Sequence, residues 1–307
     1  MNRFTFSQVI EGYLLAANAR HLSPHTIKDY TNTYRKFLNH LGEDPYFAAI
    51  TSKQVEDFFR VQEVSNKTIL NYHTGLSAMW TWAVEEQLVK ENILQRVKRP
   101  KPEKKAIQPY SQMDIKAMLS AVGISKSYTR PGKRESAHSL STAERNRAII
   151  FLLLDTGLRA AEICSLRINQ LDVRNRRITV MGKGSKERIL PFSSRTGQMM
   201  WRYLATRKDA SAGDYVFITQ LDSPFERTQL LKCLIRIGDR AGVEGVNVHR
   251  FRHTFAINYL RNGGDPWSLQ MMLGHSTMEM VKNYLALAQA DLEKTHKVAS
   301  PVDNWRL

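Results

Sequence analysis

The chain has little cysteine, no long apolar run and no apolar leader at its start. Its 307 residues include only two cysteines, Cys164 and Cys233, and both lie in apolar patterns of helical spacing. So few thiols exclude a disulfide framework, and we expect both cysteines to be reduced and buried. The longest purely apolar run extends only from Ala148 to Leu154, which is too short to span a bilayer. The opening residues, MNRFTFSQV, lack the apolar segment of a secretory signal, so we expect a soluble cytoplasmic protein without a membrane partner.

Acidic residues are also scarce relative to basic ones. Lysine and arginine together number 45 against 29 aspartates and glutamates, which gives a formal charge of +16 and a pI near 9.9. Such an excess favours a polyanionic partner, with nucleic acid ahead of a membrane surface. The charge does not by itself indicate an enzyme, because histone-like and ribosomal proteins are equally basic. The length allows two domains, each with a core of its own.

The first part of the chain, residues 1–98, shows the helical period throughout. A helix over residues 6–19 precedes one that Ser23 caps, and two more begin near Thr51 and Ser65. We find no catalytic constellation in this half of the chain. Its aromatic stripes are typical of core, while the lysines and arginines between them form either a solvated or a DNA-facing surface.

A basic segment divides the chain into two domains. Residues 96–109, RVKRPKPEKKAIQP, contain three prolines and many positive charges, which break helices and extend the backbone. We therefore expect domains at 1–98 and 110–307 with a linker at 99–109. Such a linker suits a protein that closes around a duplex, although a plain solvated tether has the same composition. Residues 123–141 are rich in serine, glycine and basic residues and indicate a mobile loop or insertion.

The second domain is predicted to be helical with a small antiparallel sheet. Residues 177–181 and 187–191 alternate as two strands, joined by a Gly-Lys-Gly-Ser-Lys turn, and residues 215–218 are expected to form a third strand. The turn lacks the spacing of a phosphate-binding P-loop. Helices are expected on either side of these strands, which makes the fold class mainly α.

The segment HRFRHTFAINYLRNGGDPWSLQMMLGHSTMEMVKNY gathers the residues that are most suited to chemistry. His249 and Arg252 are three residues apart and face the same side of a helix. A Gly-Gly-Asp-Pro sequence ends that helix and opens another, after which His275 lies at the next break. Ser276 is expected to cap a third helix, which carries Tyr284.

These side chains, with two from earlier motifs, suit the cleavage of a phosphodiester. Two arginines can hold the non-bridging oxygens of a phosphate, a lysine on a turn can protonate the leaving oxygen, and a tyrosine can attack phosphorus. The phenol needs a proton acceptor, for which His249 is a candidate. No metal and no nucleotide cofactor is required, because exchange of one ester for another is nearly isoenergetic. The candidate catalytic residues are Arg159, Lys183, His249, Arg252, His275 and Tyr284.

The same motifs resemble those of the tyrosine site-specific recombinases of the phage integrase family, with a layout close to the bacterial Xer proteins. The matching segments are TGLRAAEICSL, MGKGSKERILP, HRFRHTFA, LGHS and the tyrosine that follows, and SPHTIKDYTNTYRKFLNHL resembles the family's N-terminal DNA-binding domain. The resemblance implies a two-domain DNA clamp: a helical, SAM-like core-binding domain and a DNA breaking-rejoining catalytic domain.

The resemblance also implies a mechanism and an assembly. It implies a 3′-phosphotyrosine intermediate formed by Tyr284, with Lys183 rather than Lys186 as the general acid and His253 as a structural neighbour. It further implies double-stranded DNA with paired half-sites as the partner, and a tetramer on that DNA. The tail from about Asp291 onward is expected to pack on a neighbouring protomer.

Three other readings compete with a recombinase. His249 and His253 have the spacing of a metallohydrolase pair, although an arginine replaces the usual glutamate. A non-catalytic DNA-binding protein would explain the charge but not the grouped catalytic residues. A type IB topoisomerase would share much of the site and act without defined partner sites.

Overall fold

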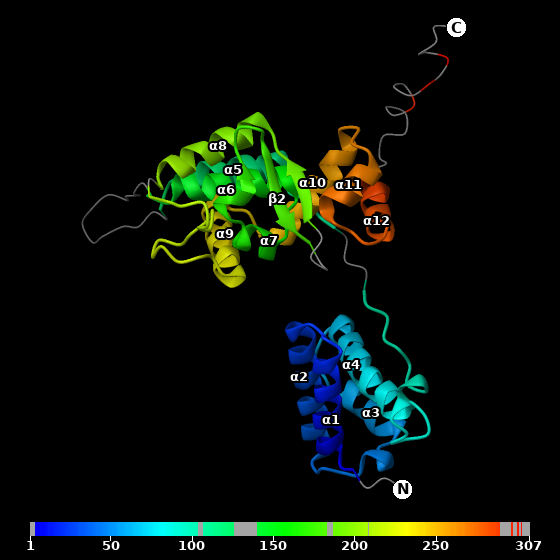
Figure 1. Cartoon of the computed structure of the whole chain (residues 1–307). Helices are drawn as coiled ribbons and strands as arrows, with labels where there is room; N and C mark the ends of the chain where they lie inside the picture. The colour runs from blue at the N-terminus through cyan, green and yellow to red at the C-terminus, as the bar shows by residue number, and fades with distance from the viewer. Residues whose placement is uncertain are drawn as a thin grey trace, which may run out of the picture. The chain divides into compact units, whose positions relative to one another are not determined.

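The computed structural model describes residues 4–103, 107–125, 140–182, 187–207 and 209–288, together with residues 296, 300 and 302. The chain divides into two compact units, Met1–Ala106 and Ile107–Leu307 (Figure 1). Residues 126–139 of the loop expected at 123–141, the turn residues Lys183 and Lys186, and nearly all of the tail after Asp291 lie outside the described residues.

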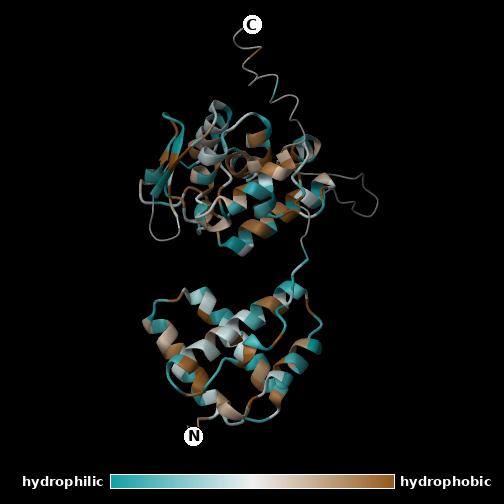
Figure 2. Cartoon of the chain, turned by 90° about the vertical axis from the view of Figure 1, so that its right-hand side faces the viewer, coloured by the Kyte–Doolittle hydropathy of each residue, from teal (hydrophilic) through white to brown (hydrophobic). Residues whose placement is uncertain are grey.

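The first unit is a bundle of helices whose starts are fixed by side-chain caps. Thr51, Ser23 and Ser65 each accept a hydrogen bond from a backbone N–H of the first turn, as expected from the sequence. The elements are α1 (Phe6–Ala19), α2 (Pro24–Leu41), η1 (Phe47–Ala49), α3 (Ser52–Arg60), α4 (Asn66–Glu85) and η2 (Ile93–Gln95). Figure 2 shows hydrophobic and hydrophilic residues interspersed along these helices, which is the amphipathic pattern predicted for them.

The core of the first unit is aromatic. The ring of Phe6 meets that of Phe37 edge to face at 5.5 Å, and Phe47 packs on Trp80 with ring centroids 4.5 Å apart. These four residues are almost completely buried. The aromatic stripes of this half of the chain are therefore core, as predicted.

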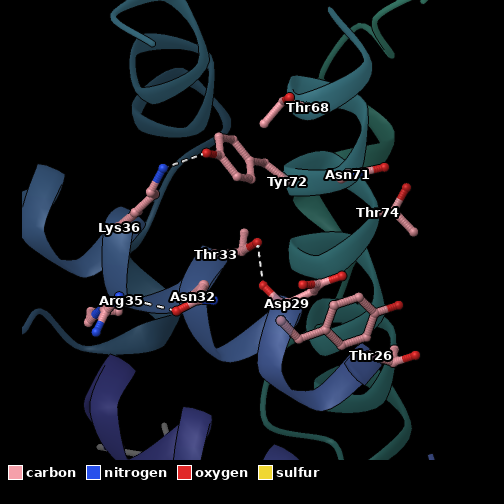
Figure 3. A pocket seen from close by; sticks show the side chains of 11 residues that line it. Thr26, Asp29, Asn32, Thr33, Arg35, Lys36, Thr68, Asn71, Tyr72 and Thr74 are labelled. Carbon is pink, nitrogen blue, oxygen red and sulfur yellow. Dashed lines mark hydrogen bonds between the residues drawn. The ribbon is translucent and has the colours of Figure 1, made fainter. Parts of the chain in front are cut away.

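A polar groove lies between α2 and α4 on this unit. Figure 3 shows Lys36 and Tyr72 facing each other across it, and the lysine Nζ donates to the phenol oxygen at 2.7 Å. The groove has a volume of about 560 Å³. The residues that line it all carry a hydroxyl, amide or charged group: Thr26, Asp29, Tyr30, Asn32, Thr33, Arg35, Lys36, Thr68, Asn71, Tyr72 and Thr74.

The second unit is mainly helical with a three-stranded sheet. Its helices are α5 (Gln112–Ala121), α6 (Ala143–Thr156), α7 (Ala160–Ser165), η3 (Ile168–Gln170), α8 (Ser194–Ala205), α9 (Arg227–Ala241), α10 (Val248–Arg261), α11 (Pro266–Leu273) and α12 (Glu279–Ala288). The helix that carries Tyr284 begins at Glu279, three residues after Ser276, so Ser276 is not its N-cap, contrary to the prediction from the sequence. Among the described residues, no helix has both the length and the apolar character needed to cross a membrane.

The sheet is antiparallel in the order β1 (Leu171–Asp172), β2 (Arg177–Met181), β3 (Glu187–Pro191). The expectation of a third strand at residues 215–218 is wrong. Tyr215 and Ile218 each form only an isolated bridge, to Arg167 and Pro224 respectively. The segment is apolar because Val216 and Phe217 fill the core, not because it joins the sheet. The true third strand is only two residues long and gives no periodic signal.

Two hydrophobic clusters hold the second unit together. The larger is centred on α6, which is buried on most sides and packs against α8 and α10. The smaller joins α10, α11 and α12, and the last two lie together at one end of the unit (Figure 1). Its buried members are Phe255, Ala256, Ile257, Leu269, Leu273, Val281 and Tyr284.

Both cysteines are free thiols, as expected. Cys164 is buried, which raises the pKa of its thiol to about 11, and Cys233 is half-buried.

Candidate active site

Three arginines converge on the C-terminal end of α11. Arg188 Nε, Arg252 Nη2 and Arg159 Nη2 donate to the successive carbonyl oxygens of residues 272, 273 and 274, at 2.9, 2.6 and 3.2 Å. These carbonyls have no partner within their own helix, and the end of a helix carries a partial negative charge. The helix end therefore holds three guanidinium groups side by side, immediately before His275.

Arg252 is held only by neutral partners. Its side chain is enclosed, with 2% of the residue exposed, and Nη1 also donates to the Gly157 carbonyl at 2.9 Å. Nη2 lies 2.8 Å from Nε2 of His275. Burial, and then the positive charge of Arg159, lower the pKa of Arg252 to about 10. The guanidinium stays charged at neutral pH, and no carboxylate neutralises it directly.

Arg159 is fixed by a carboxylate that the sequence analysis did not select. Arg159 caps α7, and Glu162 Oε1 accepts from its Nη1 at 2.9 Å, while Oε2 accepts from its backbone N–H at 2.8 Å. Glu162 Oε2 also pairs with Arg188 at 2.9 Å. Burial raises the pKa of Glu162, but the hydrogen bonds from Arg188 and Arg159 outweigh it and hold the pKa below its usual range. The Arg159 side chain remains 39% exposed, so it can still meet a ligand.

The two imidazoles expected in the site are neutral at physiological pH. Burial, and then the adjacent Arg252, lower the pKa of His275 to about 4. Its Nδ1 is buried without a hydrogen-bond partner among the described residues. His249 reaches the surface, and its partial burial together with the charge of Arg252 lowers its pKa. Neutral imidazoles beside guanidinium groups can accept or donate a hydrogen bond without adding charge.

Tyr284 lies in the same site but is enclosed. It is 2% exposed, and burial raises the pKa of its phenol. The ring stacks on His275 with centroids 6.3 Å apart, and the hydroxyl lies 2.9 Å from Nδ1 of His253. Burial, and then His249, lower the pKa of His253 to about 4. A neutral His253 can accept the phenol hydrogen bond when its Nδ1 carries no proton, and the centroid of the His249 ring lies 4.4 Å from that of His253.

The structure brings together five of the six candidate residues: Arg159, His249, Arg252, His275 and Tyr284. Lys183 lies outside the described residues. Sequence reasoning did not select Glu162 or Arg188. Glu162 stands three positions after Arg159, in the spacing of a capping box, and that was the available signal. Arg188 offered no comparable signal, because alternation along a strand does not show which polar residue is buried.

The donor set does not fit a divalent cation. Among the described residues, no group of three or more histidine, cysteine or acidic side chains could hold a metal ion. His249 and His253 lie one turn apart, but the charged residues between them in the sequence are Arg250 and Arg252. Within this cluster three guanidinium groups face a single carboxylate, that of Glu162. Such an arrangement binds an anion with oxygens on several sides, as a phosphate has.

Two family models match the chain and together cover most of it. The model described as the phage integrase family matches residues 134–291, and the phage integrase SAM-like domain matches residues 5–100. Among curated proteins, the chain is 29% identical over 291 residues to the tyrosine recombinase XerC of Bacillus pumilus, covering 90% of each chain. It is 33% identical over 196 residues to XerC of Histophilus somni, covering 59% of this chain and 66% of that one.

Solved structures agree in fold. The Tn1549 transposon integrase in complex with a circular intermediate DNA superposes with a TM-score of 0.72 at 20% identity, covering 95% of this chain and all of that one. A lambda integrase dimer bound to a core site gives a TM-score of 0.73 at 15% identity, covering 92% and 77%. The chain therefore belongs to the phage integrase family and is a Xer-like tyrosine recombinase.

Proposed function

We propose that the chain cuts and rejoins duplex DNA at paired half-sites, with Tyr284 as the nucleophile and a 3′-phosphotyrosine as the intermediate. One observation carries this proposal: Arg159, Arg252 and His275 converge at the end of α11, and the ring of Tyr284 stacks on that His275. A group of cationic side chains suited to an anion and an oxygen nucleophile thus lie next to each other in the fold.

In the proposed reaction the phenol oxygen bonds to phosphorus and the bond from phosphorus to the 5′ oxygen breaks. Arg159 and Arg252 hold the non-bridging oxygens and stabilise the charge that grows on them. His275 is held against Arg252, which suits it to a hydrogen bond with the same phosphate. The phenol proton passes to a neutral imidazole, for which His253 and His249 are the candidates.

The leaving 5′ oxygen takes a proton from a general acid. Lys183 is proposed for this role from the family resemblance. The 5′ hydroxyl of a second strand then attacks the phosphotyrosine, reversing each of these bond changes and rejoining the DNA. No external energy source is needed, because each ester is exchanged for another.

The polar groove of the first unit is proposed to contact the DNA. Arg35 and Lys36 are exposed at its rim, and its hydroxyl and amide groups match the donors and acceptors of phosphates and base edges (Figure 3). The basic linker at 99–109 would then allow the two domains, 1–98 and 110–307, to act as a clamp. Since DNA is the substrate, we also propose a cytoplasmic location. Cell fractionation would test this by asking whether the protein is recovered in the same fraction as the nucleoid DNA.

Two strands of each of two duplexes must be cut and exchanged, which requires four nucleophiles. We therefore propose a tetramer on DNA, assembled from dimers on paired half-sites, with the tail from Asp291 onward packed in trans. That tail lies almost wholly outside the described residues. The solved lambda integrase is a dimer bound to a core site, which supports the smaller of these assemblies.

The nucleophile is tested with a nicked suicide substrate that traps the covalent protein–DNA complex. Tyr284→Phe should form no covalent complex and keep half-site binding within about 3-fold of wild type, because the phenol is uncharged. Tyr259→Phe, which removes a hydroxyl from α10, is the matched control and should form the complex normally. Replacing both Arg35 and Lys36 with alanine should weaken half-site binding but not cleavage of bound substrate. A covalent complex formed by Tyr284→Phe would refute the assignment.

A further inference from the structure

Arg188 is a buried arginine of the site that has no role in the proposed reaction. Its side chain is only 12% exposed. It lies near the start of β3, paired with Val180 of β2, a few positions after the turn that contains Lys183. Arg188 differs from Arg252 in being paired with a carboxylate, and from Arg159 in being mostly enclosed, so we consider a function that acts through its neighbours.

Those neighbours lie on α7 and at the C-terminal end of α11, the two elements whose groups accept hydrogen bonds from the other arginines of the site. Arg188 Nη2 pairs with the Glu162 carboxylate at 2.9 Å, and its Nε donates to the Met272 carbonyl at 2.9 Å. Glu162 in turn holds Arg159. The Met272 carbonyl belongs to the helix end that also receives Arg252 and precedes His275.

The third guanidinium nitrogen shows how closely this side chain is seated. Nη1 is buried and has no hydrogen-bond partner among the described residues. It lies against the backbone of Gly274, where an added Cβ would stand only 3.2 Å from it. An orphaned donor in a low-dielectric setting is unfavourable. Nη1 therefore does not help to fix the Arg188 side chain in place. The side chain is fixed by the hydrogen bonds that Nη2 and Nε make to the two partners described above.

We infer that Arg188 is a positioning residue for the leaving-group step: it fixes the base of the β2–β3 hairpin to the carboxylate and helix end that hold the phosphate-binding arginines. This inference rests on the proposed function, in which Lys183 of that hairpin protonates the 5′ oxygen. Without Arg188, the sheet could shift relative to the phosphate-binding arginines. Such a shift would leave phosphate binding intact and impair protonation of the leaving 5′ oxygen.

The chemistry of the leaving group separates this role from a general structural one. When the phenol oxygen bonds to phosphorus, the electron pair of the breaking bond goes to the 5′ oxygen, which must be protonated. If sulfur replaces that bridging oxygen, the leaving thiolate is stable without a proton, because a thiol has a pKa of about 8.5. A defect in protonation disappears with the sulfur substrate, whereas a defect in phosphate binding or folding persists.

The experiment measures single-turnover cleavage of matched oxygen and 5′-bridging sulfur substrates. Arg188→Met should slow cleavage of the oxygen substrate about 100-fold, within the range for loss of general acid catalysis, and should cleave the sulfur substrate within about 3-fold of wild type. Arg188→Lys should cleave the oxygen substrate at a rate between those of wild type and Arg188→Met. Lysine keeps the positive charge but cannot make hydrogen bonds to both partners in the geometry of arginine. The control Arg177→Met removes an exposed arginine of β2 and should match wild type on both substrates.

Lys183→Ala distinguishes failure of this inference from failure of the proposed function. If sulfur restores Lys183→Ala but not Arg188→Met, Lys183 is the general acid and the inference about Arg188 is overturned. If sulfur does not restore Lys183→Ala, the proposed general acid is wrong and the inference falls with it. Wild-type cleavage of the oxygen substrate by Arg188→Met would also overturn it. Should Arg188→Met fail to fold, the same ratio of sulfur to oxygen rates in Arg188→Lys decides the question.

Discussion

At the residue scale, the choice of hydrogen-bond partner sets how much positive charge the site offers. Arg252 donates to the carbonyls of Gly157 and Leu273, which orient the guanidinium without neutralising it. Arg159 and Arg188 share a single carboxylate, that of Glu162. A site that is oriented in advance and left with excess positive charge stabilises the extra negative charge of a five-coordinate phosphate.

The buried imidazoles predict a pH dependence of stability. His253 and His275 have pKa values of about 4 in the folded chain, against 6.5 as the ordinary value. Their neutral forms favour the fold, so this contribution is complete above pH 6.5 and is lost as the pH falls toward 4. The free energy of unfolding should fall by at most about 1.4 kcal/mol per pH unit for each imidazole. The contribution of His253 is smaller because its side chain is partly exposed.

Urea unfolding of the second unit between pH 4.5 and 7 would measure this effect. Wild type should lose stability steadily as the pH falls below about 6.5. His253→Gln should show a shallower loss over the same range, because one of the two titrating groups is gone. Identical pH profiles for the two proteins would mean that the His253 pKa is not depressed in the fold.

At the element scale, the residue that ends α6 and begins the turn to α7 has to be glycine. Gly157 has φ of +61°, and a Cβ there would lie 2.6 Å from Phe255 Cδ1 and 2.9 Å from Leu273 Cδ2. The same residue's carbonyl accepts from Arg252. The close approach of three helices at this glycine therefore shapes the site.

Alanine substitutions of the glycines at two helix ends distinguish the cost of backbone strain from the cost of a steric clash. Gly242, which ends α9, has φ of +67° and nothing within 4 Å of an added Cβ. Gly242→Ala should cost about 1 kcal/mol, the strain of the left-handed conformation alone. Gly157→Ala adds a clash with packed rings and should cost about 3 kcal/mol or more and reduce cleavage. Equal losses of stability in thermal or urea unfolding would contradict the close packing at Gly157.

The elements also show what the sequence can and cannot predict. Helix starts at Ser23 and Thr51 are local events, since the capping side chain and its N–H partner are three residues apart. The sheet depends on distant pairing, which is why residues 215–218 were wrongly expected to be its third strand. Likewise, the pairing of Arg188 with Glu162 forms only after the chain has folded, so spacing could not reveal Arg188, whereas Glu162 had the local capping-box spacing from Arg159 and the family motifs placed the remaining site residues together.

At the scale of the whole molecule, two units with separate cores and a strongly basic composition fit the assembly on DNA proposed above. Deleting residues 291–307 should leave binding to one half-site unchanged, because the groove and the arginine site remain. Cooperative occupancy of paired half-sites, and the tetramer mass measured by sedimentation on full sites, should be lost. If the truncated protein still forms tetramers and recombines at the wild-type rate, the tail does not pack in trans.

In the proposed reaction, Tyr284 attacks a phosphate held by the arginines at the end of α11. The most direct measurement is mass spectrometry of the protein–DNA adduct trapped on a suicide substrate in excess EDTA. We expect a single modified peptide, with the 3′-phosphate of the DNA joined to Tyr284, formed without any divalent ion. An adduct on Tyr259 or any other residue, a 5′-phosphate linkage, or an adduct that requires a divalent ion would contradict it.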